Sequence, residues 1–319
     1  MMKKKFKVHY KTSHAIHNGK ILRIGGLLLI IDMLIVCSIN FIPVYFVILL
    51  TCLPAILLTL KDDLYGSVSV FSRLLATLFS ICLLVTLTTP IIGLDMPLPM
   101  NLNSNVIFLF FVTIFSYLVL INSMNIIDGM NGLAIINSIS ITSALIFHPF
   151  ASFLDLNSVN LLYIFMIILI LLLPLNFPFQ KIFIGDSGAY FIGFFLSFFI
   201  IRFMNTNLDL PSYGAILLLI YPAFETLFSF IRRFLNHKKI YLSDNKHLHS
   251  IIFNCIKNNF SINASNNLTT IVLLPFVFYG PICFYFFSNN LFYIFTSILI
   301  FIIIYTMTYL IIAKSSINK

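Results

Sequence analysis

Apolar runs about as long as a membrane is thick recur along the whole chain, and they restrict the fold more than any other feature. As a helix, such a run crosses a hydrocarbon layer about 30 Å thick. Helices also satisfy their own backbone hydrogen bonds, which lipid cannot do. We therefore predict ten membrane-spanning helices, at 25–39, 41–60, 74–92, 106–121, 133–147, 160–175, 189–203, 213–231, 267–287 and 291–313.

The composition supports an integral membrane protein. Of the 319 residues, 60% are hydrophobic and 9% are charged, and the mean hydropathy is +1.04. A water-soluble core of this size cannot hide so much apolar surface. We expect an all-α fold, a polytopic transmembrane helix bundle that forms a single integral membrane domain over residues 1–319.

The distribution of lysine and arginine predicts the orientation, because these residues are retained on the cytoplasmic side. With ten crossings and the N-terminus inside, 18 of the 19 fall in cytoplasmic segments, and Arg202 alone falls outside. Both termini are therefore predicted to be cytoplasmic, with a basic segment at 1–24. An odd number of crossings would place the basic 232–257 segment on the wrong face. The net charge of +9 indicates attraction to anionic lipid headgroups and not to nucleic acid.

Neither disulfides nor a cleaved leader are expected. The 5 cysteines show no CxxC pair and no metal-ligand spacing, and most lie in or beside apolar runs, where cysteine behaves as a small hydrophobe. The segment before Ile24 has no apolar core of the kind that a signal peptide needs.

Four polar stretches interrupt the apolar pattern, and all four fall in predicted cytoplasmic loops. They are KDDLYGS, NSMNIIDGMNGL, NFPFQKIFIGDSGAYFIGF and SDNKHLHS, in the loops 61–73, 122–132, 176–188 and 232–260. Polar loops that share one face are what a single active site between helix ends requires.

The adjacent acids Asp62 and Asp63 follow the second apolar run. Such a pair is often no more than solvated loop charge. At a membrane interface beside basic residues, the same pair is able to hold a divalent cation or take a proton from a phosphate. Both interpretations stay open on spacing alone.

Asp186 lies in a Gly-Asp-Ser-Gly sequence immediately before an apolar run. As structure, this is a helix start with a capping side chain. As chemistry, small residues admit a large anionic ligand and the carboxylate offers a hard oxygen to a cation such as Mg²⁺. The two interpretations are compatible, because a helix N-terminus also favours phosphate. Nearby Phe183 is either a stacking platform for a base or an interfacial aromatic anchor.

His247 and His249 lie two residues apart in the most basic loop. Zinc needs more ligands than this pair supplies, so contact with phosphate or proton handling fits better, with a merely solvated loop as the alternative. Two acids, Asp32 and Glu225, fall inside apolar runs, where an ionisable group is usually functional or tightly partnered. We favour a structural hydrogen-bonding role for both.

Together and in the same order, the four stretches resemble the motifs of the polyprenyl-phosphate N-acetylhexosamine-1-phosphate transferases, or glycosyltransferase family 4. DDLYG is similar to the family's paired-aspartate loop, NSMNIIDGMNGLA to its DG motif and SDNKHLHS to its histidine loop. NFPFQKIFIGDSGAYFIGF is similar to its N-x-x-P to G-F segment, and HAIHNGKILRIGG to the start of its first conserved helix. One such motif is weak, but four in order over residues 14 to 255 form a specific signal.

The resemblance implies a role for each polar residue. Asp186 would ligate the catalytic Mg²⁺, with Mn²⁺ as an alternative ion. Asp62 and Asp63 would take a proton from the lipid phosphate or organise metal and phosphate, whether transfer is direct or passes through an aspartyl intermediate. Asp128 and Asn125 would line the diphosphate site. The remaining residues would surround the nucleoside and sugar or contact phosphate: Asn122, Asn131, Asn176, Phe183, Lys181, His247 and His249.

The resemblance also implies the reaction and its setting. We expect transfer of N-acetylhexosamine-1-phosphate, from UDP-N-acetylglucosamine, to undecaprenyl phosphate with release of UMP, at the cytoplasmic face of a bacterial inner membrane. The pathway would be the first membrane step of surface-polysaccharide synthesis of the O-antigen type. Alternatives are the phospho-N-acetylmuramoyl-pentapeptide transferase of cell-wall synthesis, a transporter or flippase, and an inactive relative.

Three features depart from the family pattern. Asn131 stands where a second aspartate is frequent, and Ser250 stands where a further histidine or basic residue is frequent. Relatives also commonly begin with one more helix ahead of HAIHNGK, which is why ten helices and not eleven are expected here.

Overall fold

The computed structural model describes residues 23–317 apart from 41, 67, 96–99 and 238–243. The predicted basic segment 1–24 therefore falls almost wholly outside the described residues. The part of the chain that is described forms helices and no strand, which confirms the all-α prediction. The helices are α1 (Gly25–Ile39), α2 (Pro43–Tyr65), α3 (Val70–Leu87), α4 (Met100–Asn103), α5 (Val106–Ile127), α6 (Leu133–Phe147), the 3-10 helix η2 (Pro149–Phe153), α7 (Leu156–Asn176), α8 (Gly185–Thr206), α9 (Tyr213–Leu218), α10 (Ile220–Leu235), α11 (Leu248–Ile256), α12 (Ile262–Phe287) and α13 (Leu291–Ile317).

Each of the ten predicted spans overlaps a helix, although α3 ends at Leu87 and not at residue 92. Seven of the described helices are long and apolar enough to cross a membrane, judged by length and composition: α2, α3, α5, α7, α8, α12 and α13. Two shorter apolar helices, α1 and α6, coincide with the predicted ranges 25–39 and 133–147. The chain is thus a multi-pass membrane protein.

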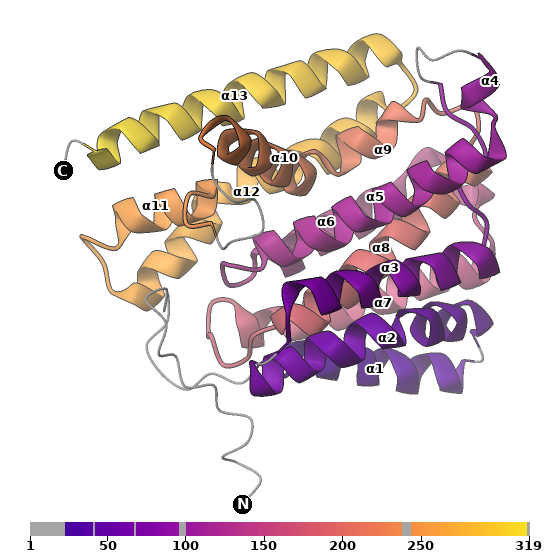
Figure 1. Ribbon diagram of the computed structural model, residues 1–319, viewed down its shortest axis with the longest axis horizontal. Coiled ribbons are helices and arrows are strands. Elements are labelled where there is room, and N and C mark those ends of the chain that lie inside the picture. Colours follow the sequence, from indigo (N-terminus) through magenta and orange to yellow (C-terminus); the bar gives the residue numbers. More distant parts are fainter. Residues whose placement is uncertain (1–22, 41, 67, 96–99, 238–243, 318–319) are drawn as a thin grey trace, which may run out of the picture.

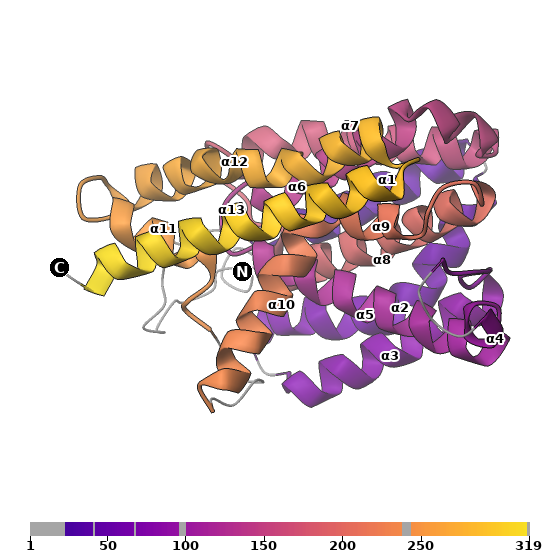
Figure 2. The ribbon, with the colours of Figure 1, turned by 90° about the horizontal axis from the view of Figure 1, so that it is seen from above.

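One predicted span differs, because 213–231 is not a single helix. The structure divides it into α9 and α10 at Leu219. Pro222 accounts for the break, since proline has no N–H to donate to the Leu218 carbonyl and its ring crowds that carbonyl. Beyond the break, α10 leaves the bundle at a steep angle (Figure 2). A short helix, α11, also forms within the segment predicted as the loop 232–260.

Helix α8 is the centre of the bundle. In its most apolar stretch 89% of the residues are buried, against 28–44% in the other long helices. It packs against α1, α2, α5 and α6. The approach to α1 is very close, because a Cβ atom added to Gly26 would lie 2.3 Å from the backbone nitrogen of Gly188. Small residues therefore fix how α1 crosses the start of α8.

The polar stretches collect at one end of the bundle (Figure 1). The C-terminal ends of α2 and α5 lie there, together with the N-terminal ends of α3, α6 and α8. The short helix α4 marks the opposite end. The short helix α11, which contains part of the histidine stretch, is also near this end, so the described residues of all four stretches lie on the same side of the bundle.

Candidate active site

Asp63 holds the first turn of α8 in place. Its carboxylate accepts hydrogen bonds from the backbone nitrogen of Asp186 at 3.0 Å and from Ser187, whose backbone nitrogen and hydroxyl lie 2.9 and 2.8 Å away. The first N–H groups of a helix have no partner within the helix, so a carboxylate there satisfies donors and complements the helix dipole. Asp63 is only 3% exposed, and the Arg23 guanidinium lies 3.8 Å from it.

Gly185 makes this contact possible. Its φ of +73° is a conformation that side chains disfavour, and a Cβ atom there would lie 2.8 Å from a carboxylate oxygen of Asp63. The Gly-Asp-Ser-Gly sequence is therefore a helix start whose cap comes from a different helix, α2. The predicted capping of this helix by its own Asp186 or Ser187 is wrong, because the structure shows no cap bond from the preceding residue and supplies Asp63 instead.

Arg73 joins the other two carboxylates. Its guanidinium lies 2.5 Å from Asp186 and 3.2 Å from Asp62, and the three side chains remain partly accessible. Asp62 also accepts a hydrogen bond from the backbone nitrogen of Val68 at 3.0 Å. The adjacent acids of α2 thus have different surroundings. Asp63 is enclosed and fully hydrogen-bonded, whereas Asp62 faces the accessible side with Arg73.

Asp128 completes the acidic group from the end of α5. Burial raises the pKa of this carboxyl well above its usual range, and the nearby negative charges of Asp186 and Asp63 raise it further, against the opposing influence of Arg23 and the Gly185 backbone. An added cation close to these acids would lower this pKa again. Asp62, Asp63, Asp128 and Asp186, named here the acidic cluster, are therefore brought together by three helices.

The turn after Asp128 is held by neighbours on both sides. The backbone nitrogen of Gly132 donates to the side-chain oxygen of Asn176, whose amide nitrogen in turn donates to the Ile182 carbonyl at 2.8 Å. On the other side, Asn131 is anchored through its backbone to α12, by Asn266 and Thr270. Asn131 is 3% exposed. Asn176 thus connects two of the predicted stretches.

The histidine segment reaches the same turn. His247 and His249 stack with 5.3 Å between ring centroids and 4° between ring planes. His249 is buried, and its Nε2 would lie 2.9 Å from a Cβ atom placed on Gly129. Burial lowers the pKa of His249 to about 4, so this ring is neutral near pH 7. His247 bonds to Glu225 at 3.0 Å, which confirms the predicted hydrogen-bonding role of Glu225.

Four further predicted residues, Lys181, Asn122, Asn125 and Phe183, have the following surroundings. The ammonium of Lys181 is exposed and lies 5.5 Å from the ring centroid of Phe179. The amide of Asn122 donates to the Leu118 carbonyl of its own helix at 2.7 Å. Both Asn122 and Asn125 lie on the last turns of α5, since that helix runs on to Ile127. Phe183 is half-buried, and its carbonyl accepts a bond from Gly25.

Sequence reasoning missed the residues that organise the cluster. Arg73 entered only as a charge for orientation, although a lone arginine next to an apolar run is itself a sign of a partnered, functional residue. Asn266 and Thr270 lie beyond all four stretches and gave no signal that separates them from other polar residues on helices. Contact across the fold, and not spacing, reveals them.

The comparison with known proteins decides the family. A model of glycosyl transferase family 4 matches residues 45–204. This chain belongs to glycosyl transferase family 4. Its relatives include an undecaprenyl-phosphate alpha-N-acetylglucosaminyl 1-phosphate transferase of Thermotoga maritima, 30% identical over 132 residues. They also include a probable undecaprenyl-phosphate N-acetylglucosaminyl 1-phosphate transferase of Bacillus subtilis, 28% identical over 163 residues.

These similarities cover only part of each protein. The two matches include 41% and 49% of this chain, and 39% and 42% of the respective relatives. The family 4 match includes the acidic cluster and Asn176, and it ends before the histidine segment.

The acidic cluster has the donor atoms for a hard divalent cation. Carboxylate oxygens are the ligands that Mg²⁺ prefers, and Asp62 and Asp186 already converge on one cationic group, the Arg73 guanidinium. Among the described residues, no three acids, histidines or cysteines are arranged as a finished metal-ligand set. The residues fit a cation in kind, provided that the Arg73 side chain gives way.

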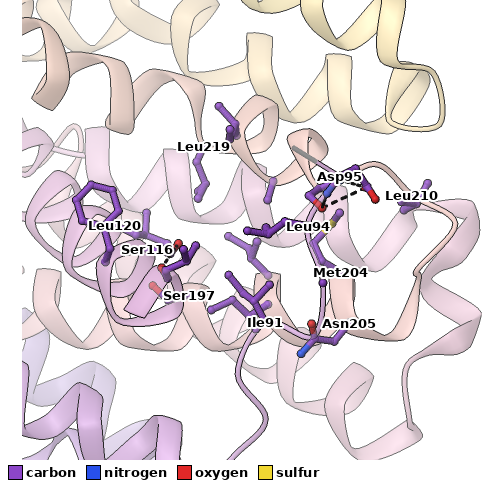
Figure 3. Close-up of a pocket in the computed structure, with 18 of the residues that line it drawn as sticks. Ile91, Leu94, Asp95, Ser116, Leu120, Ser197, Met204, Asn205, Leu210 and Leu219 are labelled. Carbon is purple, nitrogen blue, oxygen red and sulfur yellow. Dashed lines mark hydrogen bonds between the residues drawn. The ribbon is translucent and has the colours of Figure 1, made fainter. Parts of the chain in front are cut away.

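A large cavity lies away from the acidic cluster. It measures about 580 Å³ and is lined mostly by apolar residues, many of them from α5, α8 and α9, with Ser116 and Ser197 toward one side and Asp95 and Asn205 toward the other (Figure 3). It belongs to the half of the bundle near α4 and contains none of the acidic cluster. Its lining suits apolar groups, so we do not place the polar chemistry there.

Proposed function

We propose that this protein transfers N-acetylhexosamine-1-phosphate, and specifically N-acetylglucosamine-1-phosphate, from a UDP-sugar to undecaprenyl phosphate, with release of UMP. The observation that carries the proposal is the acidic cluster with Arg23 and Arg73 at the first turn of a buried membrane helix. A helix N-terminus with basic side chains attracts phosphate, and the carboxylates can manage the accompanying cation and proton. The names of both relatives support this donor sugar and this lipid acceptor over a muramoyl-pentapeptide donor.

The proposed reaction makes and breaks one bond to the same phosphorus atom. An oxygen of the lipid phosphate attacks the phosphorus next to the sugar. The bond from this phosphorus to the bridging oxygen then breaks, and that oxygen leaves as part of UMP. Catalysis of such a step consists mainly of positioning and charge neutralisation.

Within the cluster, Asp62 is our candidate for the group that receives a proton from the lipid phosphate. It is the accessible member of the adjacent pair, whereas the Asp63 oxygens are occupied by Asp186 and Ser187. We assign to Asp63 the positioning of the α8 N-terminus. Arg73 and Arg23 would bind phosphate oxygens, and Asp128 would line the diphosphate site as a group with a raised pKa.

We further propose Mg²⁺ as the cofactor, held by Asp186 with the help of Asp62. Bound there, the ion would neutralise the diphosphate and make UMP a better leaving group. His247 and His249 would contact phosphate from the opposite side of the turn at Gly129. Asn131 and Asn176 would stay in the nucleoside region, where they shape the backbone between the two stretches.

The proposal places the site at the cytoplasmic face of a bacterial inner membrane. The basic residues that the structure describes at this end include Arg23, Arg73 and Arg232, in accordance with retention of positive charge inside. A soluble UDP-sugar would reach the cluster from the cytoplasm, and the polyprenyl tail would stay in the bilayer. The product would begin surface-polysaccharide synthesis.

A direct assay tests the proposal. Purified protein in detergent receives undecaprenyl phosphate and UDP-N-acetylglucosamine, with Mg²⁺ or with EDTA, and UMP release is followed. We expect release that depends on the ion and on both substrates. Absence of UMP with every UDP-N-acetylhexosamine would overturn the transfer activity, and full activity of Asp186→Asn would overturn the metal assignment.

A further inference from the structure

Glu225 lies at a junction of three helices near the histidine segment. It is 1% exposed on α10, three residues after the proline that begins this helix's separate course. One carboxylate oxygen bonds to His247 Nδ1 at 3.0 Å and accepts from the backbone nitrogen of Leu248 at 2.9 Å. The other accepts the hydroxyl of Tyr305, from α13, at 2.7 Å. Both oxygens of this buried acid are thus occupied.

These bonds determine how the histidine segment enters α11. His247 is the residue before the first turn of that helix, and Leu248 is its first residue. One oxygen of Glu225 therefore holds a side chain and the adjacent backbone donor at once. The carboxylate accepts the Nδ1 proton, which leaves the Nε2 atom of His247 for other partners, with the nearest Asp244 oxygen at 3.8 Å.

The His247 ring is connected to the acidic cluster through two contacts. The ring of His247 stacks on His249, and His249 lies against Gly129, the residue after Asp128. The Nδ1 atom of His249 is buried without a hydrogen-bond partner among the described residues. A polar atom in this state is a ready donor or acceptor for a ligand, because binding would satisfy it. A rotation of the His247 ring would disturb this stack and the adjacent turn.

We propose that Glu225, supported by Tyr305 of the last long helix, is a positioning residue of the transfer site, and that it fixes the ring orientation and tautomer of His247 and the place of His249 beside Asp128. This inference rests on the proposed function for its catalytic consequence. Its structural consequence, the protonation of one ring nitrogen of His247, is independent of any activity. Two helices outside the matched family range, α10 and α13, would then belong to the site.

Glu225→Met is the decisive variant, because it keeps the length of the side chain and removes both acceptor oxygens. Glutamine would be less informative, since its carbonyl oxygen still accepts the Nδ1 proton, whereas Glu225→Asp keeps the carboxylate acceptor on a shorter side chain. We expect kcat for UMP release to fall about 10- to 100-fold in the methionine variant, as for other partners that orient a functional histidine. We expect KM for the UDP-sugar to change little and the aspartate variant to recover part of kcat.

A matched pair of tyrosine variants tests the role of α13. Tyr305→Phe removes the bond to Glu225, and Tyr279→Phe removes a comparable bond at 2.8 Å to the Ser297 carbonyl, away from the site. We expect kcat to fall about 2- to 10-fold in the first, in accordance with the loss of one hydrogen bond, and to stay unchanged in the second. Equal effects of both would show that α13 acts only on general stability and would overturn the role of Tyr305.

Nitrogen NMR of protein labelled with ¹⁵N-histidine supplies the measurement that does not need activity. The His247→Asn variant identifies the His247 signals. We expect a protonated Nδ1 in the wild type and loss of that state in Glu225→Met, which has no acceptor for the proton. An unchanged ring state would overturn the inference even if the enzyme is active. A wild type that releases no UMP but shows the expected ring state would overturn the proposed function and leave the positioning role in place.

Discussion

The Arg73 guanidinium lies 2.5 Å from Asp186 and 3.2 Å from Asp62, so one positive side chain pairs with two carboxylates of different helices. The guanidinium thus contacts the oxygens to which we propose that a divalent cation binds. If the cation binds there, it would compete with Arg73 for these oxygens, and its entry would free the guanidinium for a phosphate.

Arg73→Gln tests this competition. Without the guanidinium the two carboxylates repel each other, so we expect added Mg²⁺ to raise the melting temperature of the variant more than that of the wild type. UMP release should fall at least about 10-fold, because the variant lacks the guanidinium that we propose as a phosphate ligand. Arg202→Gln is the matched control, since Arg202 also pairs with an acid at 2.5 Å but at the other end of the bundle. Equal Mg²⁺ responses in the variants and the wild type would contradict the competition.

Substitution of Asp63 is expected to lower stability, whereas substitution of Asp62 is expected to abolish activity. Asp63→Asn should lower the stability by about 2 to 3 kcal/mol, because an amide oxygen replaces a carboxylate at the start of α8 and hydrogen bonds to charge are the stronger ones. Asp62→Asn should keep the melting temperature and lose UMP release. The chain has no tryptophan, but Cys37 and Cys52 are buried, so a thiol-reactive fluorophore can report unfolding.

Asp155→Asn is the control for the capping argument. Asp155 caps α7 through Ser158 at 3.1 Å and lies away from the acidic cluster. This variant should melt earlier but keep its activity once folded. If Asp63→Asn melts like the wild type, the capping role of Asp63 is wrong.

Two glycines with positive φ offer another matched pair. Gly185→Ala should prevent formation of the α8 start, because the added Cβ would meet Asp63 at 2.8 Å in a backbone conformation that alanine already disfavours. Gly66→Ala has a similar φ of +63° but open space around it, so it should cost only the conformational strain, about 1 to 2 kcal/mol. Thermal melts and UMP release measure both. Similar losses in the two variants would contradict the contact with Asp63.

The buried ring of His249 predicts a pH dependence of stability. The folded protein holds the pKa of His249 at about 4 by burial, below its ordinary value of 6.5. Between these values the unfolded chain binds a proton that the folded chain does not, so stability should fall as the pH drops from about 6.5 towards 4. The maximum loss is about 3 kcal/mol. His249→Gln should show a flatter decline, measured by thermal melts across this range, and identical slopes would contradict the assignment.

The sequence was sufficient for the architecture because the lipid solvent imposes a simple rule. Apolar length predicted ten spans, and a helix lies on each of them. The rule has no information about breaks within an apolar run, so the division of 213–231 required attention to Pro222. It also cannot distinguish Asp62 from Asp63, because their separate roles arise from α3 and α8, far along the chain.

The site was predictable as a set of stretches and less so as a set of contacts. Motif order brought Asp128, Asp186 and His249 to one place, and the structure has them at the same end. The sequence did not predict Arg73, Asn266 and Tyr305 as part of the site, since each contacts a partner that is distant in sequence. Charge in an apolar context is the one signal among these that closer reading would have caught.

The contact between Gly26 and Gly188 has a consequence for how such proteins diversify. Where two backbones touch, there is no side chain to exchange, and an added methyl group at Gly26 would push α1 away from α8. The distance between α1 and the start of α8, next to the acidic cluster, is therefore fixed by the backbones. In a random library screened for a changed donor sugar, we expect the selected substitutions in α11, in α12 and in the turn at Gly129, and none at Gly26 or Gly188.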